Sequence, residues 1–186
     1  YLDELVVVKP EYKIAGRTFD KNIDYFTSCT DSSVYNPELA NMTAALSVDI
    51  YNEDEIVKAY HSLGFDEVFI CDYDEDYHNP MSSGCAIGFK KSDYADETIC
   101  LVSVRGSDNL ADWVGNLSLI TIDNDKHAGF SLPANRIYEN ITKLVETKNI
   151  SGNIKYVLTG HSRGAAVANL LAVKLMEKGV NPANIY

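Results

Sequence analysis

The chain has 186 residues, of which 46% are hydrophobic and 23% are charged, and its formal net charge is −11. This composition is typical of one globular domain. The negative charge argues against nucleic acid as a partner, because phosphates would repel it, and against a basic surface for anionic membranes.

The pattern of residues 1–35 suggests a strand or two with loops. Two amphipathic helices are predicted in the part of the N-terminal half that follows. In residues 36–51 apolar side chains recur every three or four positions, and Pro37 suits a first helical turn. A second helix is expected to begin after Asn52, whose side chain can cap it, and to end at Gly64.

Strands and helices alternate in the rest of the chain. Strands are predicted at residues 68–71, 85–89, 98–104 and 154–159, helices at 131–148 and 163–178, and the start of a further element at 184–186. The near-continuous apolar run of 98–104 suits a strand that is covered on both faces. We therefore predict a single α/β domain over residues 1–186, with a mostly parallel sheet and helices on both faces.

An acidic stretch in the middle of the chain partly matches a calcium-binding loop. Asp72, Asp74 and Asp76 occupy the alternate positions of such a loop. Tyr77, however, stands where the loop needs glycine, and Ser83 stands where it needs glutamate. We expect a solvated acidic loop and no metal site.

The cysteines do not fix the redox compartment of the protein, whereas its N-terminus and its sequons give a weak indication. No pair of cysteines has the CxxC spacing, so two disulfides and four buried thiols both remain open for Cys29, Cys71, Cys85 and Cys100. Because the chain begins at Tyr1, we expect an N-terminal segment to have been removed. Together with N-x-S/T sequons at Asn41, Asn116, Asn140 and Asn149, this leans towards a secreted protein.

The sequence GHSRG at residues 160–164 follows one predicted strand directly and opens the next predicted helix. In α/β hydrolases a turn of this kind exposes a nucleophilic serine, so Ser162 is expected to have a strained backbone. Gly160 and Gly164 are expected because a side chain at either position would collide with a neighbouring strand or helix. The N–H of Arg163 would then face the oxyanion. A purely structural glycine turn is the alternative.

A second stretch, VSVRGSDNLADWVGNL at 102–117, ends a predicted strand with Arg-Gly-Ser. An α/β hydrolase needs a second backbone N–H for the oxyanion, supplied by the loop after an earlier strand. Gly106 would let this loop approach the substrate, and Ser107 is then the natural donor.

Taken together, GHSRG, VRGS followed by DW, and HAGF at 127–130 resemble the class 3 lipase family, the fungal triacylglycerol lipase-like α/β hydrolases. The leader 36–51 is similar to the N-terminal helices of that family, and the resemblance spans roughly residues 37–186. It implies the N-terminal part of an α/β-hydrolase fold and a lipase or carboxylesterase that acts on acyl esters without cofactor or metal.

The resemblance also implies roles for particular residues. Ser162 would be the nucleophile, and Ser107 and the Arg163 N–H would form the oxyanion hole. A short lid would lie in about 108–120 and could contact a lipid interface transiently, although simple core packing is the alternative for its Trp113. HAGF would be a structural site near the serine turn.

A serine nucleophile needs a base and an orienting carboxylate, and in this fold both follow the serine in the chain. No histidine or aspartate follows Ser162; the histidines are His61, His78, His127 and His161. His161 is adjacent to the serine, so its ring should point elsewhere. We therefore expect these residues to be the N-terminal part of a longer hydrolase, whose C-terminal remainder carries the catalytic Asp and His. A non-catalytic hydrolase-fold binding module is the alternative, and nothing supports a serine peptidase.

Overall fold

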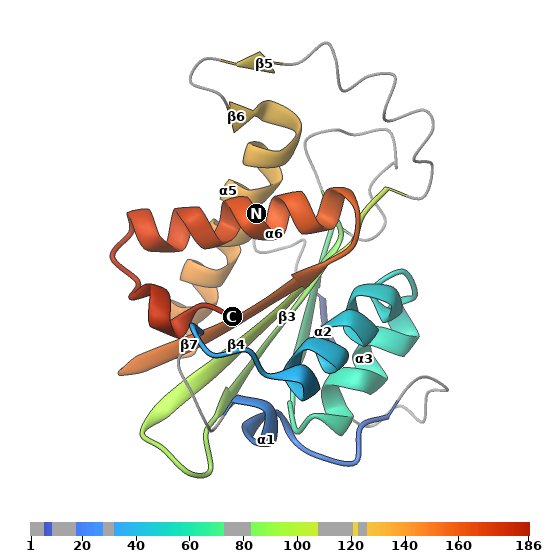
Figure 1. Ribbon diagram of the computed structural model, residues 1–186, viewed down its shortest axis with the longest axis vertical. Coiled ribbons are helices and arrows are strands. Elements are labelled where there is room, and N and C mark those ends of the chain that lie inside the picture. Colours follow the sequence, from blue (N-terminus) through green and yellow to red (C-terminus); the bar gives the residue numbers. More distant parts are fainter. Residues whose placement is uncertain (1–5, 9–17, 28–31, 73–82, 108–120, 123–125) are drawn as a thin grey trace.

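The computed structural model describes residues 6–8, 18–27, 32–72, 83–107, 121–122 and 126–186. A five-stranded sheet runs through them in the order β1-β2-β3-β4-β7, with helices on both sides (Figure 1). Its strands are β1 (Val6–Val8), β2 (Val68–Cys71), β3 (Cys85–Lys91), β4 (Glu97–Val104) and β7 (Asn153–Gly160). A separate two-stranded sheet pairs β5 (Thr121–Ile122) with β6 (Lys126–His127).

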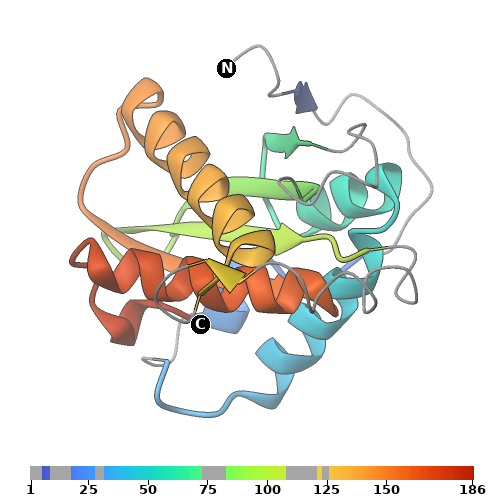
Figure 2. The same cartoon turned by 90° about the horizontal axis from the view of Figure 1, so that it is seen from above.

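Helices α2 and α3 lie on one side of the sheet and α5 and α6 on the other, as the two views show (Figures 1 and 2). The helices are α1 (Ile23–Thr27), α2 (Pro37–Asp49), α3 (Glu53–Ser62), α5 (Ala128–Thr147) and α6 (Arg163–Glu177), with a 3₁₀ turn at Pro182–Asn184. None of the described helices is long and apolar enough to span a membrane.

The predicted helix boundaries in the N-terminal half are confirmed by the caps. The side chain of Asn36 accepts hydrogen bonds from the N–H groups of Glu38 and Leu39 at the start of α2. The side chain of Asn52 accepts one from Glu55 N–H at 3.1 Å at the start of α3. Gly64, just after α3, has a φ of +92°, a conformation that glycine adopts without steric cost.

The prediction of a mostly parallel sheet is wrong for the described strands. The pairs β1–β2, β2–β3 and β3–β4 are antiparallel, and β4–β7 is parallel. The reason is the connections: β3 and β4 are joined by the short turn 92–96, which reverses the chain, whereas α5 lies between β4 and β7 in the sequence and allows a crossover. The sheet is mixed, and the fold is α/β.

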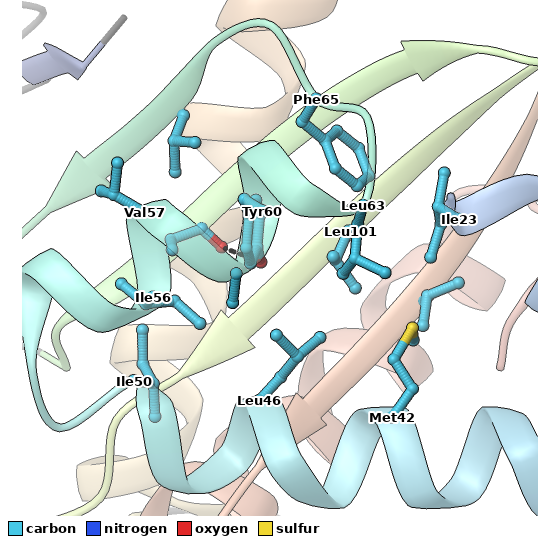
Figure 3. Packing of buried hydrophobic residues seen from close by; sticks show 14 of the residues in the cluster. Ile23, Met42, Leu46, Ile50, Ile56, Val57, Tyr60, Leu63, Phe65 and Leu101 are labelled. Atoms are coloured by element: carbon cyan, nitrogen blue, oxygen red, sulfur yellow. Dashed lines mark hydrogen bonds between the residues drawn. The ribbon is translucent and has the colours of Figure 1, made fainter. Parts of the chain in front are cut away.

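Apolar side chains of alternate strand residues fill two separate cores, which confirms that the central strands are covered on both faces. Ile99 and Leu101 of β4 pack into the core under α2 and α3, while Cys100 and Val102 pack into the core under α5 and α6. Figure 3 shows the first core, in which Leu46 of α2 and Tyr60 of α3 lie over the sheet beside Leu101.

The residues predicted to begin a further element do begin to pair with the sheet. Ile185 forms a parallel bridge with Tyr156 of β7. The Tyr186 N–H donates to the Tyr156 carbonyl at 2.8 Å, and the Leu158 N–H donates to the Tyr186 carbonyl at 2.9 Å.

The expected solvated acidic loop is wrong for its first residue. The side chain of Asp72 is only 6% exposed and forms an ion pair with Arg136 of α5 at 3.2 Å. Asp72 follows β2 directly with a φ of +55°, so the turn directs its carboxylate towards α5 and not into water. Asp74, Asp76 and Tyr77 lie outside the described residues, within which no group of three potential metal ligands occurs.

Candidate active site at the β7–α6 turn

Ser162 lies in a sharp turn between the end of β7 at Gly160 and the start of α6 at Arg163. Its backbone has a φ of 56° and a ψ of −122°, which confirms the predicted strain, since this region is costly for a residue with a side chain. Its carbonyl accepts the first hydrogen bonds of α6, but its side chain makes no capping bond to the helix. The hydroxyl of this half-buried residue is therefore not used to close the helix.

The glycines on either side of the turn allow a very close approach between β4, β7 and α6. A Cβ atom on Gly160 would lie 2.6 Å from the carbonyl carbon and oxygen of Gly164 and 2.9 Å from the Val104 carbonyl oxygen. A Cβ atom on Gly164 would collide with that same Val104 oxygen. The prediction that both positions exclude side chains is thus confirmed, and the obstacle is backbone that cannot move aside.

The loop after β4 passes directly against the turn. Val104 at the end of β4 is paired with Gly160 at the end of β7, so both strands end at the same edge of the sheet. A Cβ atom on Gly106 would lie 2.5 Å from the His161 carbonyl oxygen and 3.4 Å from Cβ of Ser162. Ser107, the next residue, is half-buried. The loop that carries Ser107 and the serine turn are therefore in contact, and the role of Ser107 as an oxyanion donor stays a prediction.

The side chain of Arg163 connects the turn to Ser83 and Gly129, a role that the sequence reasoning missed. Arg163 is 8% exposed, and its Nη1 donates to Oγ of Ser83 at 2.9 Å while its Nη2 donates to the Gly129 carbonyl at 3.0 Å. Burial lowers the pKa of the guanidinium to about 10, so it remains a cation at neutral pH. The sequence signal that could have predicted this role is the presence of a large cationic residue among the small residues of the turn.

Pro133 explains why the Gly129 carbonyl can accept this bond. Helix α5 begins at Ala128, earlier than the predicted residue 131, and Pro133 lies inside it. Proline has no N–H, so the bond that residue 133 would donate to the carbonyl four residues earlier cannot form. That carbonyl belongs to Gly129 of the HAGF motif, and it receives Arg163 instead. The motif therefore lies next to the turn, as the family resemblance implied.

Among the described residues no hydrogen bond joins Ser162 to a histidine. Nδ1 of His161 lies 3.2 Å from the Tyr51 hydroxyl, and the two rings meet edge to face at 6.1 Å, so this imidazole packs beside the turn as predicted. Nδ1 of His61 lies 2.8 Å from the Phe65 carbonyl oxygen at the end of α3. His78 and the side chain of His127 are outside the described part, as are Trp113 and the predicted lid 108–120.

Comparison with known proteins gives three matches. Residues 101–186 match the family model described as Lipase (class 3). A protein of Fusarium solani named secreted mono- and diacylglycerol lipase 1 is 33% identical over 93 residues, which cover 46% of this chain and 28% of that lipase. A solved structure described as a triacylglycerol lipase with a serine protease triad at its catalytic centre is 19% identical, with a TM-score of 0.42, over 57% of this chain and 42% of the other.

The family model and the Fusarium relative confirm the resemblance to the class 3 lipase family that the three motifs indicated. The family match begins inside β4 and includes both the RGS loop and the serine turn. The aligned part is 28% of the length of the Fusarium lipase, so this chain corresponds to a minor part of that relative.

Proposed function

We propose that this protein is a serine hydrolase that cleaves acyl esters, a lipase or carboxylesterase, with Ser162 as its nucleophile. The observation that carries the proposal is the conformation of Ser162, a strained residue between a strand and a helix whose hydroxyl caps nothing. Strain of this kind persists where the surrounding structure enforces it, and here the contacts of Gly160 and Gly164 do so. The match of residues 101–186 to the lipase family supports the same reaction.

In the proposed reaction, the Ser162 hydroxyl attacks the ester carbonyl and its proton passes to a base, giving a tetrahedral intermediate. The negative oxygen is held by the N–H of Arg163 at the start of α6 and the N–H of Ser107 in the loop after β4. The first N–H groups of a helix have no partner within it, and the helix dipole adds partial positive charge there. The alcohol then leaves with a proton, and water releases the acyl group from Ser162.

The base and its carboxylate partner are proposed to lie in a C-terminal remainder of the same α/β-hydrolase domain, of which residues 1–186 form the N-terminal part. Two observations support this. The ring of His161 is engaged by Tyr51, and that of His61 is engaged at the end of α3, away from the turn. The order of the triad in this fold also places the aspartate and the histidine after the serine.

Acylglycerols are the substrates to test first, because the similar Fusarium protein is named as a mono- and diacylglycerol lipase. The proposed reaction uses no cofactor. The segment 108–120 is proposed to contact the lipid interface transiently, since its apolar residues follow the oxyanion loop in the sequence.

The experiment is to treat the natural full-length protein with a fluorophosphonate, which reacts with activated serines, and to locate the adduct by peptide mass spectrometry. We expect one adduct on Ser162, together with hydrolysis of p-nitrophenyl esters and acylglycerols but not of peptides. Ser162→Ala should abolish both the adduct and the hydrolysis. The matched control is Ser47→Ala on the exposed side of α2, where the hydroxyl donates to the Ala44 carbonyl, and it should retain both.

The opposite result has a clear meaning. A folded full-length protein that forms no adduct and cleaves no ester would contradict the proposed hydrolase and favour a hydrolase-fold module that binds without catalysis.

A further inference from the structure

Two buried cysteines face each other across neighbouring strands. Cys71 is the last residue of β2 and Cys85 is the first residue of β3, and the two are directly opposite in the antiparallel ladder. Their Sγ atoms lie 2.6 Å apart, and the residues are only 2% and 1% exposed. No other described cysteine faces a second one: Cys100 of β4, equally buried, is opposite Phe89.

From this geometry we propose that Cys71 and Cys85 form a cross-strand disulfide. Directly opposite residues of an antiparallel pair have Cβ atoms about 4.5–5.5 Å apart, close to the roughly 3.5–4.5 Å that a disulfide spans. The register of β2 and β3 therefore holds the two side chains where a bond can form without rearranging the strands. This bond forms whatever reaction Ser162 performs.

The bond forms by thiol–disulfide exchange with a disulfide donor, either a small-molecule disulfide or a disulfide oxidoreductase. One cysteine thiolate attacks the donor, and a mixed disulfide forms as one donor thiol leaves. The second cysteine then attacks the mixed disulfide and the other donor thiol leaves. The two cysteines are oxidised, the donor is reduced to two thiols, and the two protons released by the cysteines are taken up by the leaving thiolates.

The exchange takes place before the strands are fully packed. In the folded protein the hydrogen bond with Cys71 and the burial raise the pKa of the Cys85 thiol well above its ordinary value. A buried, protonated thiol is a poor nucleophile. The donor must therefore act during folding, in an oxidising compartment.

The residues next to the two cysteines explain what the bond fixes. Asp72, directly after Cys71, is ion-paired with Arg136 of α5. On the other side, the carbonyl of Gly84 accepts a hydrogen bond from the N–H of Arg105 at 2.7 Å, and Ser83 accepts one from Arg163. The disulfide would thus join the two ends of the β2–β3 connection at the level where they contact the loop and the helix of the candidate active site.

The first test uses the natural full-length protein produced in an oxidising compartment. It is denatured without reductant, alkylated with iodoacetamide, digested and analysed by mass spectrometry. We expect a linked pair of peptides containing Cys71 and Cys85, and an alkylated Cys100. Alkylation of both Cys71 and Cys85 in the unreduced protein, or a link from either to another cysteine, would overturn the proposal.

The second test compares thermal unfolding with and without reductant. Closing a connection of this length should raise Tm by roughly 6–12 °C, so reductant should lower the Tm of the wild type by about that amount. The double variant Cys71→Ala/Cys85→Ala should lose this response, whatever its own Tm. The matched variant Cys100→Ala, which removes an equally buried thiol, should keep it. An unchanged response in the double variant, or none in the wild type, would contradict the disulfide.

Discussion

Ser162 has a backbone conformation that a residue with a side chain adopts only at a cost in free energy. This strain can be measured separately from the proposed role of its hydroxyl as a nucleophile. The φ of 56° and ψ of −122° place it outside the regions that L-residues favour. Such strain costs about 1–3 kcal/mol and is stored in the folded state. Glycine at this position would carry much less of it.

Ser162→Gly should therefore give a more stable protein than Ser162→Ala, by about 1 kcal/mol, although both variants lack the proposed nucleophile. The unfolded-state entropy of glycine opposes this gain, so the comparison is a conservative one. Urea unfolding of the two variants measures the difference in unfolding free energy. Equal stabilities, or a more stable alanine variant, would mean that the turn does not strain this residue.

At the scale of elements, Arg163 joins three parts of the fold through one side chain. Its guanidinium connects the start of α6 to Ser83 before β3 and to Gly129 at the start of α5. Both acceptors are buried from water, so the guanidinium supplies their hydrogen bonds. Leaving one such acceptor unpaired lowers the free energy of unfolding by about 1–3 kcal/mol.

Replacing Arg163 with methionine, which has a similar length, should lower the free energy of unfolding by about 2–4 kcal/mol, because two buried acceptors lose their donor. Lys178→Met, an exposed change just after α6, is the control and should cost no more than about 0.5 kcal/mol. A double-mutant cycle with Ser83→Ala should give a coupling energy of about 1 kcal/mol. If Arg163→Met unfolds like the wild type, the guanidinium does not hold these elements together.

Helix α1 is attached to the sheet by a buried carboxylate. Asp24 is 1% exposed; its carboxylate receives hydrogen bonds from Lys90 at 2.7 Å and from the Ser92 hydroxyl at 2.6 Å. Burial by itself raises the pKa of Asp24, but the bonds from Lys90 and Ser92 outweigh it, and the pKa is lower than its ordinary value. The charged carboxylate is thus the form that the folded protein binds better.

The contribution of Asp24 to stability should therefore depend on pH. Since its folded pKa is below its unfolded pKa, the contribution is complete above about pH 5 and is lost as the pH falls through the folded value. Asp24→Asn should lower the unfolding free energy by about 2–3 kcal/mol at pH 7, and the difference from the wild type should shrink below about pH 4. Denaturant titrations across this range measure it. The control is Asp66→Asn, which changes an exposed carboxylate and should show no such trend. A constant deficit for Asp24→Asn across this pH range would refute the linkage.

The sequence predicts some of these elements well because their signals are local. Asn52 and Gly64 mark the two ends of α3 by chemistry that acts within a few residues. The relative direction of two paired strands has no local signal in the sequence. The apolar runs of β3 and β4 would look the same whether their neighbours were parallel or antiparallel. The predicted start of α5 at residue 131 is three residues late, because a tertiary bond from Arg163 satisfies the Gly129 carbonyl that Pro133 leaves unpaired in the first turns of the helix.

In the candidate site, too, the local features could be predicted from the sequence and the tertiary contacts could not. GHSRG predicts the turn, its strain and its glycines, since these follow from the geometry of a few consecutive residues. The contacts of the Arg163 side chain could not be predicted, because Ser83 and Gly129 come close to it only when β3 and α5 are packed around the turn. Cys71 and Cys85 lie opposite each other because of the register between β2 and β3. This register cannot be predicted from the spacing of the cysteines in the sequence.

At the scale of the whole molecule, the formal net charge of −11 on residues 1–186 should influence how the protein approaches a lipid substrate. An acidic protein is repelled by an anionic surface, and salt screens this repulsion over a Debye length of about 30 Å at 0.01 M and about 10 Å at 0.1 M. If the protein is the proposed lipase, hydrolysis of an ester in anionic vesicles should rise several-fold between these salt concentrations. In neutral vesicles the rate should change less than about twofold.

The measurement is the initial rate of ester hydrolysis by the full-length protein in the two kinds of vesicle, with Ser162→Ala as the background. A rate that falls with salt in anionic vesicles would show instead that a local basic surface guides the protein to the lipid.

The parallel pairing of β4 with β7 also determines when during folding the candidate site can exist. Every pair in this ladder, from Glu97 with Asn153 to Val104 with Gly160, joins residues that are 56 positions apart in the sequence. Contacts over such a separation require the closure of a long loop, which costs conformational entropy. Such contacts therefore form late and slow folding. The RGS loop and the serine turn come together only at the end of this ladder. A chain that has formed its helices but not yet this pair of strands would have no partly assembled site. If the protein is the proposed hydrolase, a nascent or partly unfolded molecule is therefore expected not to cleave esters.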